Sequence, residues 1–416
     1  MPARTLLVIV VLLAGCNAVQ EFHGPTVSER PDADVGVPEP PGQTLDVDAG
    51  LCTDLANDGA NCGACRHSCL GGSCREGRCQ PVVLAEHLGD SSGAGGSSAD
   101  GGPNSGPGAV VVDATHAYWL NGLTSLMRIP LAGGKPARVA ELPRVGVGKL
   151  VMSDAIYILS GGALFRVTKE GALTRLADYP TGVRDFALTT SEIVFMTGRL
   201  SASSTADVFV CPRTGCPAAG PSSVSVSLRT GALVDGIAAT DAWLFVSAVS
   251  TASQASLSKF DRKTGTLKAM IGQHAQRYAG PTVDGVNVYS SDYRYIVRSA
   301  IDPNPDSSVM GDKYIVSGDD VRMAAVPSFD EGFITWAEGW GPRRVVRCAK
   351  RGCAEPEPLW VSAAGAVPTD WWGKAGAPDG AVGLGTNDVA IVFTTGDGKL
   401  MKLAKPARMT APPTTP

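Results

Sequence analysis

The chain has 416 residues, of which 44% are hydrophobic and 18% charged, so it can form a globular body with a sizeable core. Its 50 glycines and 29 prolines favour turns over long helices. The formal net charge of −4 gives no general argument for nucleic-acid binding, which needs a basic face, and 5 histidines are few for a histidine-ligated metalloenzyme. We therefore expect no nucleic-acid partner.

The N-terminus has the pattern of a secretory signal. After Arg4 comes an apolar run at 6–14, which is shorter than the about 20 residues needed to span a bilayer. The alternative is a buried N-terminal strand. Residues 13–16, LAGC, resemble the bacterial lipobox, which implies removal of residues 1–15 and lipidation of Cys16. Two acyl chains suffice for stable attachment. Asn17 is not the aspartate that in this family retains proteins at the inner membrane, so the resemblance implies the outer membrane.

Residues 16–50 lack helical or strand periodicity and include the run PEPPG, so we expect a disordered tether. Residues 51–80 then form a cysteine-rich module. It holds Cys52, Cys62, Cys65, Cys69, Cys74 and Cys79. In an exported chain such density predicts disulfides, with the pairing left open. Two alternatives are a zinc site at Cys62 and Cys65 with His67 nearby, and redox exchange at the same pair. The NCGxCxxxC core resembles modules in some bacterial surface lipoproteins.

A short strand and a linker follow. Residues 81–88, PVVLAEHL, read as the last strand of a blade although they precede any first strand, so we expect them to close the ring as the outer strand of the final blade. The alternative closing segment is 405–410, KPARMT. Residues 89–108 are a Gly/Ser linker, and residues 406–416 form a disordered tail.

Residues 109–405 repeat a unit of four short strands joined by tight turns, which predicts an all-β, seven-bladed β-propeller. One aromatic residue marks the second strand of each unit. These residues are Tyr118, Tyr157, Phe195, Phe245, Tyr289, Trp336 and Phe393. The units resemble bacterial seven-bladed propellers with the pattern aVDat.vYW…l.RvpldGG.p..la, a family that implies a fold and little chemistry.

Two CxxxxC pairs lie on the repeat, Cys211 with Cys216 and Cys348 with Cys353. The first cysteine of each pair aligns with Ile129 on the third strand, and a glycine comes directly before the second cysteine. We expect the two cysteines to oppose each other across a hairpin and to form a disulfide. No histidine lies near either pair in sequence, so a metal site is the weaker interpretation.

The sequence contains no G-x-S-x-G, H-E-x-x-H or Walker loop, so we expect no catalytic residues, metal site or cofactor. Asp302, Asn304 and Asp306 have the spacing of a calcium loop, but the glycine and the closing glutamate are missing, which favours a turn. Trp371 and Trp372 favour packing over ligand stacking.

Charged residues just ahead of the inner strands predict a ligand site at the mouth of the central channel. They are Arg144, Arg184, Asp185, Asp320 and Arg322. Mixed charge suits a polar or anionic ligand, and it equally suits a hydrated channel mouth. We expect a lipid-anchored, non-enzymatic scaffold at the cell surface or in the periplasm, with a protein or polysaccharide partner. The alternative is a metal-dependent hydrolase or lyase of the lactonase type.

Overall fold

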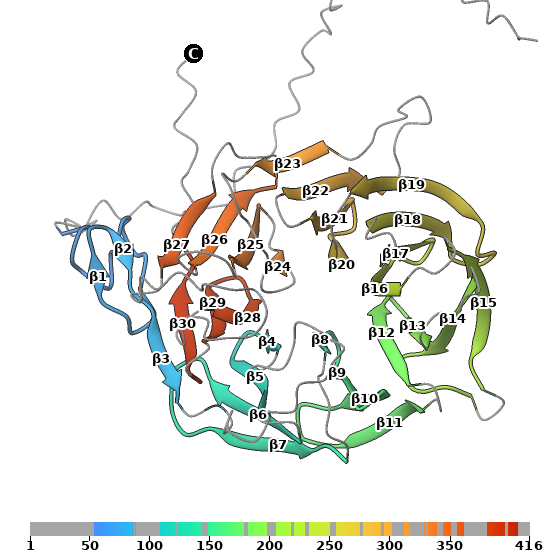
Figure 1. Ribbon diagram of the computed structural model, residues 1–416. Coiled ribbons are helices and arrows are strands. Elements are labelled where there is room, and N and C mark those ends of the chain that lie inside the picture. The colour runs from blue at the N-terminus through green and yellow to red at the C-terminus, as the bar shows by residue number, and fades with distance from the viewer. Residues whose placement is uncertain are drawn as a thin grey trace, which may run out of the picture. The chain divides into compact units, whose positions relative to one another are not determined.

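Short apolar strands separated by polar turns form a ring of sheets in the computed structural model (Figure 1). All residues that it describes belong to one unit, Leu51–Pro416. The described ranges are 54–86, 88, 109–121, 124–143, 149–178, 182–197, 205–217, 220–228, 233–249, 255–274, 278–292, 295–301, 312–316, 328–329, 332–338, 344–350, 356–361, 381–395 and 398–406. Across these ranges, no helix has the length and apolar character needed to cross a membrane.

Seven four-stranded antiparallel sheets form the seven blades, which confirms the predicted all-β propeller. Blades 1 to 3 comprise β4 (Val110–Val112), β5 (His116–Asn121), β6 (Ser125–Pro130), β7 (Ala137–Glu141); β8 (Lys149–Met152), β9 (Ile156–Ser160), β10 (Ala163–Val167), β11 (Leu173–Asp178); β12 (Val183–Leu188), β13 (Glu192–Thr197), β14 (Thr205–Pro212), β15 (Ser222–Ser227). Blades 4 and 5 comprise β16 (Leu233–Ala239), β17 (Trp243–Val249), β18 (Ala255–Asp261), β19 (Leu267–His274); β20 (Tyr278–Val283), β21 (Asn287–Asp292), β22 (Tyr295–Ala300), β23 (Asp312–Val316). Blade 6 comprises β24 (Ser328–Phe329), β25 (Phe333–Glu338), β26 (Arg344–Ala349) and β27 (Glu357–Val361).

The predicted aromatic marker lies on the second strand of every blade and is buried. The seven side chains, from Tyr118 on β5 to Phe393 on the second strand of blade 7, are 0 or 1% exposed. They belong to apolar clusters, for example that of Tyr289 and Trp336 from adjacent blades. Burying one large aromatic side chain per blade between neighbouring sheets stabilises the propeller without a single central core.

Blade 7 is closed by a strand from the beginning of the body. It comprises β28 (Ala381–Thr386), β29 (Ala390–Thr395), β30 (Leu400–Ala404) and β3 (Val82–Ala85). Val82 pairs with Lys402, and Val83 with Met401. Strand β3 therefore occupies the outer position for which residues 405–410 were the alternative. The part of that segment beyond Pro406 lies outside the described residues.

The cysteine-rich module packs against blade 7. Its hairpin consists of β1 (Cys74–Arg75) and β2 (Arg78–Cys79). Its buried cysteines share an apolar cluster with Phe393 and Leu403 of blade 7. The buried Lys402 side chain joins three segments, because its Nζ donates to the carbonyl of Leu70 in the module at 2.5 Å and to that of Leu131 in blade 1 at 2.7 Å.

The exposed outer strands carry devices that discourage pairing with other chains. Among the described outer strands, all except β15 contain a register shift against their neighbour. A bulge twists an edge away from a new strand. On β15 the carbonyl of Ser225 is instead covered by Gly265 of the next blade, where an added Cβ would lie 2.3 Å from that oxygen. A side chain at position 265 would clash with the β15 backbone, so only glycine lets this turn pack against β15.

Lys402→Met should lower the free energy of unfolding by about 2 kcal/mol, because two buried carbonyls lose a charged donor. Urea unfolding followed by circular dichroism measures this change. Lys268→Met on the exposed side of β19 is the matched control and should change stability by less than about 0.5 kcal/mol. Equal effects of the two substitutions would show that Lys402 does not join the three segments energetically.

Candidate functional site

The turn between the first and second strands is built around a polar side chain. In blade 1, Oδ1 of Asp113 accepts hydrogen bonds from the backbone N–H of Thr115 at 2.8 Å and of His116 at 2.7 Å. In blade 5, Oδ1 of Asp284 accepts from Val286 and Asn287 in the same way. Aspartate is suited to this position because its short carboxylate mimics a backbone turn. The second oxygen is thereby left facing the neighbouring blade.

A reciprocal contact, here called the blade clasp, joins blade 1 to blade 2. Arg128 on β6 donates to the backbone carbonyl of Lys169 at 2.9 Å. The Nζ of Lys169 in turn forms an ion pair with Oδ2 of Asp113 at 2.8 Å, and the hydroxyl of Tyr118 donates to the same oxygen at 3.1 Å. Each blade thus gives the other a cation, so neither can rotate without losing a charged hydrogen bond.

The same clasp recurs between blades 5 and 6. Arg298 donates to the carbonyl of Lys350 at 2.8 Å, and Lys350 Nζ lies 3.2 Å from Oδ2 of Asp284. Tyr289 donates to that carboxylate at 3.0 Å. Between blades 2 and 3 the cation is Arg213, which lies 3.3 Å from Asp154 and donates to the hydroxyl of Ser153 at 2.8 Å, while Tyr157 donates to Asp154 at 3.1 Å. These cations and carboxylates are engaged by neighbouring blades, so they act as structural groups.

The clasp shifts the acid–base behaviour of its members. Burial opposes ionisation of Asp113, but hydrogen bonds from Lys169, Thr115 and His116 outweigh it and lower the pKa of the carboxyl. Burial, together with the adjacent carboxylate, raises the pKa of Tyr118 to about 12. Both shifts keep Asp113 charged and Tyr118 a hydrogen-bond donor at neutral pH.

Asp185 joins the inner strands of three blades. Its Oδ1 accepts from Lys149 Nζ of blade 2 at 2.8 Å and from the N–H of Phe186 at 2.8 Å. Its Oδ2 accepts from the N–H of Ile237 in blade 4 at 2.7 Å. Lys149 also donates to the carbonyl of Phe186 at 2.7 Å. The buried carboxylate is therefore satisfied by the protein itself.

The predicted channel-mouth site is covered only in part by the described residues. Arg184 is exposed on β12, next to the buried Asp185. Arg144, Asp320 and Arg322 lie outside the described residues. The ligand site stays a prediction, and Arg184 is its one member that the structure describes as exposed. Asp302, Asn304, Asp306, Trp371 and Trp372 also lie outside the described residues, as does Cys16.

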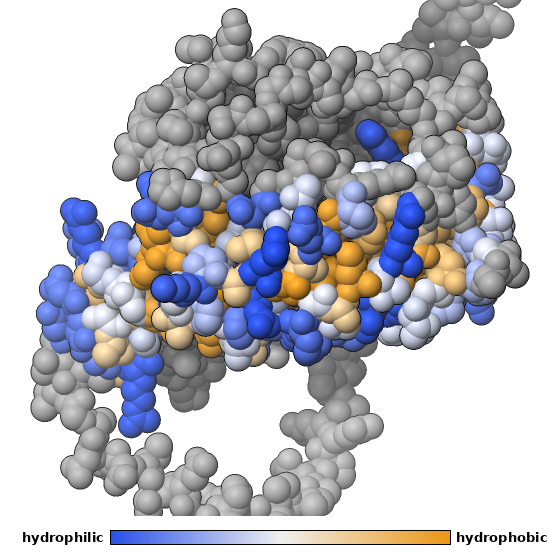
Figure 2. Space-filling model, turned by 90° about the horizontal axis from the view of Figure 1, so that it is seen from below, coloured by the Kyte–Doolittle hydropathy of each residue, from blue (hydrophilic) through white to orange (hydrophobic). Residues whose placement is uncertain are grey.

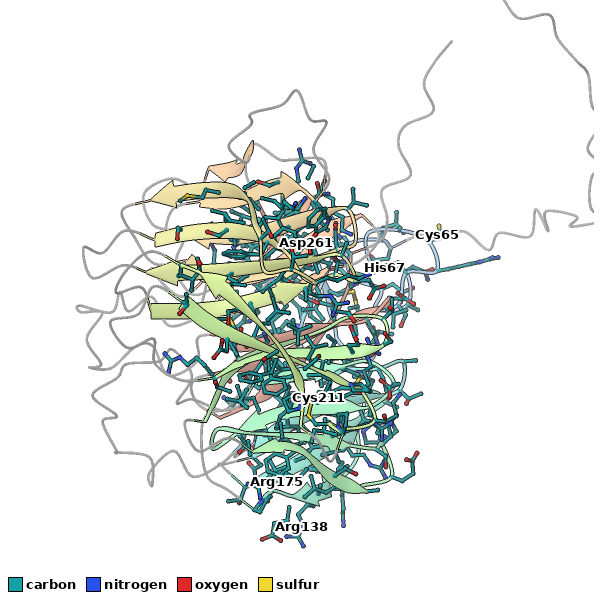
Figure 3. The ribbon with its side chains drawn as sticks, turned by 90° about the vertical axis from the view of Figure 1, so that its right-hand side faces the viewer. Cys65, His67, Arg138, Arg175, Cys211 and Asp261 are labelled. Atoms are coloured by element: carbon teal, nitrogen blue, oxygen red, sulfur yellow. A yellow bond between two sulfur atoms is a disulfide. The ribbon has the colours of Figure 1, made fainter. Side chains whose placement is uncertain are left out.

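Disulfides account for the described cysteines. The structure contains Cys62–Cys74, Cys69–Cys79 and Cys211–Cys216, and Cys65 and Cys348 are disulfide-bonded as well. Cys52 and Cys353 lie outside the described residues. Figure 3 shows Cys65 and His67 in the module, apart from Cys211 on β14.

The zinc alternative does not fit the module. The sulfur atoms of Cys62, Cys69 and Cys79 lie within 4.8 Å of one another, as metal ligands do. Each of them is nevertheless part of a disulfide, which leaves no thiolate to bind a metal. The redox alternative requires Cys62 and Cys65 to exchange with each other. Both are disulfide-bonded, but Cys62 pairs with Cys74.

One detail of the predicted cysteine pair was wrong. Cys211 lies on β14, but its cross-strand partner is Ile193 of β13, and Cys216 lies beyond the end of β14 and before β15 begins at Ser222. The disulfide therefore closes the turn after the third strand, where Gly215 has a φ of 133°. The ladder between β14 and β15 ends at the pair Val210 and Ser222, so the two cysteines are not opposed ladder residues.

The clasp contacts could not be recognised from the sequence. Their signal was present, because Asp113 and Tyr118 of blade 1 have the same spacing as Asp284 and Tyr289 of blade 5. The cation that binds each aspartate comes from the following blade, and a pattern within one repeat does not reveal a partner in the next.

Comparison with known proteins finds similarity in the fold and none in sequence families. No protein-family model matches the sequence, and no curated protein sequence matches it. The chain is similar to a catalytically inactive virginiamycin B lyase from Staphylococcus aureus crystallised with quinupristin, with a TM-score of 0.52, 15% identity, and coverage of 78% of this chain and 98% of that one. It is also similar to BamB from Moraxella catarrhalis, with a TM-score of 0.42, 14% identity, and coverage of 71% and 84%. At 15% identity the likeness to the lyase concerns the propeller fold alone.

Asp185→Asn should lower the free energy of unfolding by about 3 kcal/mol, because the amide places a donor against Lys149 or Ile237 N–H in a buried position. Arg184→Gln, one residue away and exposed, should change it by less than about 0.5 kcal/mol. Chemical unfolding of both variants measures the difference. A neutral Asp185→Asn would contradict the structural role and return Asp185 to the ligand site.

Asp113→Asn should change how stability depends on pH. Because the pKa of Asp113 is lowered on folding, its contribution is complete above the unfolded carboxyl range near pH 4 and is lost as the pH falls through the lowered value. The variant should lose about 2 kcal/mol at neutral pH and show a shallower fall in stability in acid. Unfolding measured from about pH 2 to pH 7 tests this. The exposed Glu86→Gln should retain the wild-type profile, and an equally shallow profile there would contradict the assignment.

Proposed function

We propose that the chain is a lipoprotein of the cell envelope whose propeller is a rigid, non-enzymatic scaffold for binding another protein. The observation that carries the scaffold is the use of charged side chains between blades: Asp113, Asp185 and Asp284 bind cations or backbone donors of neighbouring blades. A ring whose buried charges are paired between blades is held in one shape, and a rigid surface loses little conformational entropy on binding.

The anchor rests on the sequence, and the disulfides support an oxidising compartment. Residues 13–16 end an apolar run in the manner of a lipobox, and the module contains Cys62–Cys74 and Cys69–Cys79. The module precedes the ring in sequence and packs on blade 7. Lipid on Cys16 would therefore attach the propeller to the membrane through the module. Because Asn17 is not the aspartate that retains lipoproteins at the inner membrane, we place the anchor in the outer membrane.

The described surface is suited to a protein partner. Figure 2 shows polar and apolar side chains interspersed over one side of the ring. Exposed apolar side chains occur at Val286 and Val389, which are 69 and 54% exposed, and the exposed ion pair of Arg138 and Glu141 lies on β7. A mixed surface of this kind is compatible with a non-obligate protein interface, whose overall composition is about that of the remaining protein surface.

Cys16→Ser should move the protein from the membrane fraction to the soluble fraction, because the residue that would carry the acyl chains is lost. Cell fractionation followed by immunoblotting measures the distribution. Asn17→Ser keeps the cysteine and serves as the control, which should stay with membranes. Retention of Cys16→Ser in the membrane fraction would contradict the anchor and leave the scaffold proposal untouched.

The scaffold is tested by photo-crosslinking on intact cells, with the crosslinking residue at Val286, Val389 or Arg138 of the full chain. A protein crosslinked in stoichiometric amount from one of these surfaces is the expected result. A melting temperature that rises with added divalent metal and falls again with a chelator would favour the hydrolase or lyase instead. Absence of any crosslinked protein from all three positions would contradict a protein partner.

A further inference from the structure

His67 connects the cysteine-rich module to blade 7 through both of its ring nitrogens. Nδ1 lies 2.5 Å from the backbone carbonyl oxygen of Cys62 within the module. Nε2 lies 2.6 Å from the carbonyl oxygen of Lys405, directly after β30 of blade 7. The His67 side chain is half-buried, and Figure 3 labels it near Cys65. Its position at the boundary makes its protonation state matter to the docking of the module.

Both contacts require a proton on the histidine. A carbonyl oxygen accepts hydrogen bonds and cannot donate, whereas a neutral imidazole carries one N–H and one lone pair. Two carbonyls at hydrogen-bond distance are therefore satisfied together only by the imidazolium form. In the neutral form one ring nitrogen would direct its lone pair at a carbonyl oxygen, and one of the two contacts would become repulsive.

The groups around His67 do not supply a permanent counter-charge. On blade 7 the neighbouring titratable residues are Lys402, whose Nζ is bound to the carbonyls of Leu70 and Leu131, and Lys405. On the module they are the exposed Arg66 and Asp58, and Asp58 accepts from Asn61 at 2.6 Å. Among the described residues His67 forms no ion pair with a carboxylate. Its two ring nitrogens contact the carbonyl oxygens of Cys62 and Lys405.

We infer that His67 is a pH-sensitive latch that docks the cysteine-rich module on blade 7 when protonated and loosens it when neutral. Histidine changes charge between about pH 5 and pH 8, so the latch would act within an environmental range. Loosening removes the direct contact at Lys405, and it weakens the neighbouring contact of Leu70 with Lys402. The closing strand β3 follows the module directly in the chain and should become less protected with it.

The protonation state is tested on the wild-type protein by ring-nitrogen NMR of the full chain labelled at histidine. Both nitrogens of His67 should carry protons at about pH 5.5, and the transition to the neutral form should coincide with the loosening. His116 is the internal control, because its Nδ1 lies 2.8 Å from the hydroxyl of Thr115, which can donate or accept. His67 with one unprotonated nitrogen at about pH 5.5 would overturn the inference.

The loosening is tested by hydrogen exchange of peptides covering β3 and β30, with exchange times scaled for the intrinsic effect of pH. Protection in the wild type should fall by about ten-fold between about pH 5.5 and pH 8. His67→Gln carries both of its N–H donors on one nitrogen and does not titrate, so its protection should be low and independent of pH, whereas His116→Gln should behave as the wild type. Equal protection of the wild type at both pH values would also overturn the inference. This result would leave the proposed scaffold standing, because the ring contacts do not involve His67.

Discussion

A hydrogen bond from a cation on the third strand of one blade to the carbonyl just beyond the third strand of the next blade is the contact on which the ring depends. Arg128 makes it from blade 1 to blade 2, Arg298 from blade 5 to blade 6, and Lys402 from blade 7 back to blade 1. Lys259 joins blade 4 to Ile301 of blade 5 in the same way. Because the acceptor is backbone, its side chain is free to vary, and in two blades it became the lysine that completes the clasp. Charged hydrogen bonds in partly buried positions are stronger than neutral ones, so a few of them suffice to orient whole sheets.

This use of charge changes how ionisable residues on a propeller should be interpreted. Asp185 and Arg184 are adjacent in sequence and were grouped as one ligand site, yet one is a buried junction of three blades and the other is exposed. Alternation along a strand separates such neighbours onto opposite faces. A binding surface on this ring is therefore to be sought among exposed turns and rim residues, whose side chains are not already bound to another blade.

The repeated features could be predicted from the sequence and the contacts between repeats could not. The buried aromatic of each second strand recurs with the period of the blade, so Tyr118 to Phe393 could be placed correctly. The partner of Asp113 could not, since Lys169 belongs to the next unit. Cys216 was misplaced because the hairpin was assumed to be tight. The contact of His67 with Lys405 joins residues 338 apart in sequence and uses a backbone oxygen, so no pattern of residue types announces it.

The closure of blade 7 by β3 also sets an order of events during synthesis. The strand Val82–Ala85 emerges early but pairs only with β30, so the earliest part of the ring waits for the latest. Closing so long a loop is entropically costly and slow, which keeps the ring open until the C-terminal blade is made. Module docking depends on the same last strand, through Lys402 and Lys405. A chain interrupted before β30 would lack both contacts at once. Ring closure and module docking therefore both require that synthesis has reached the last blade.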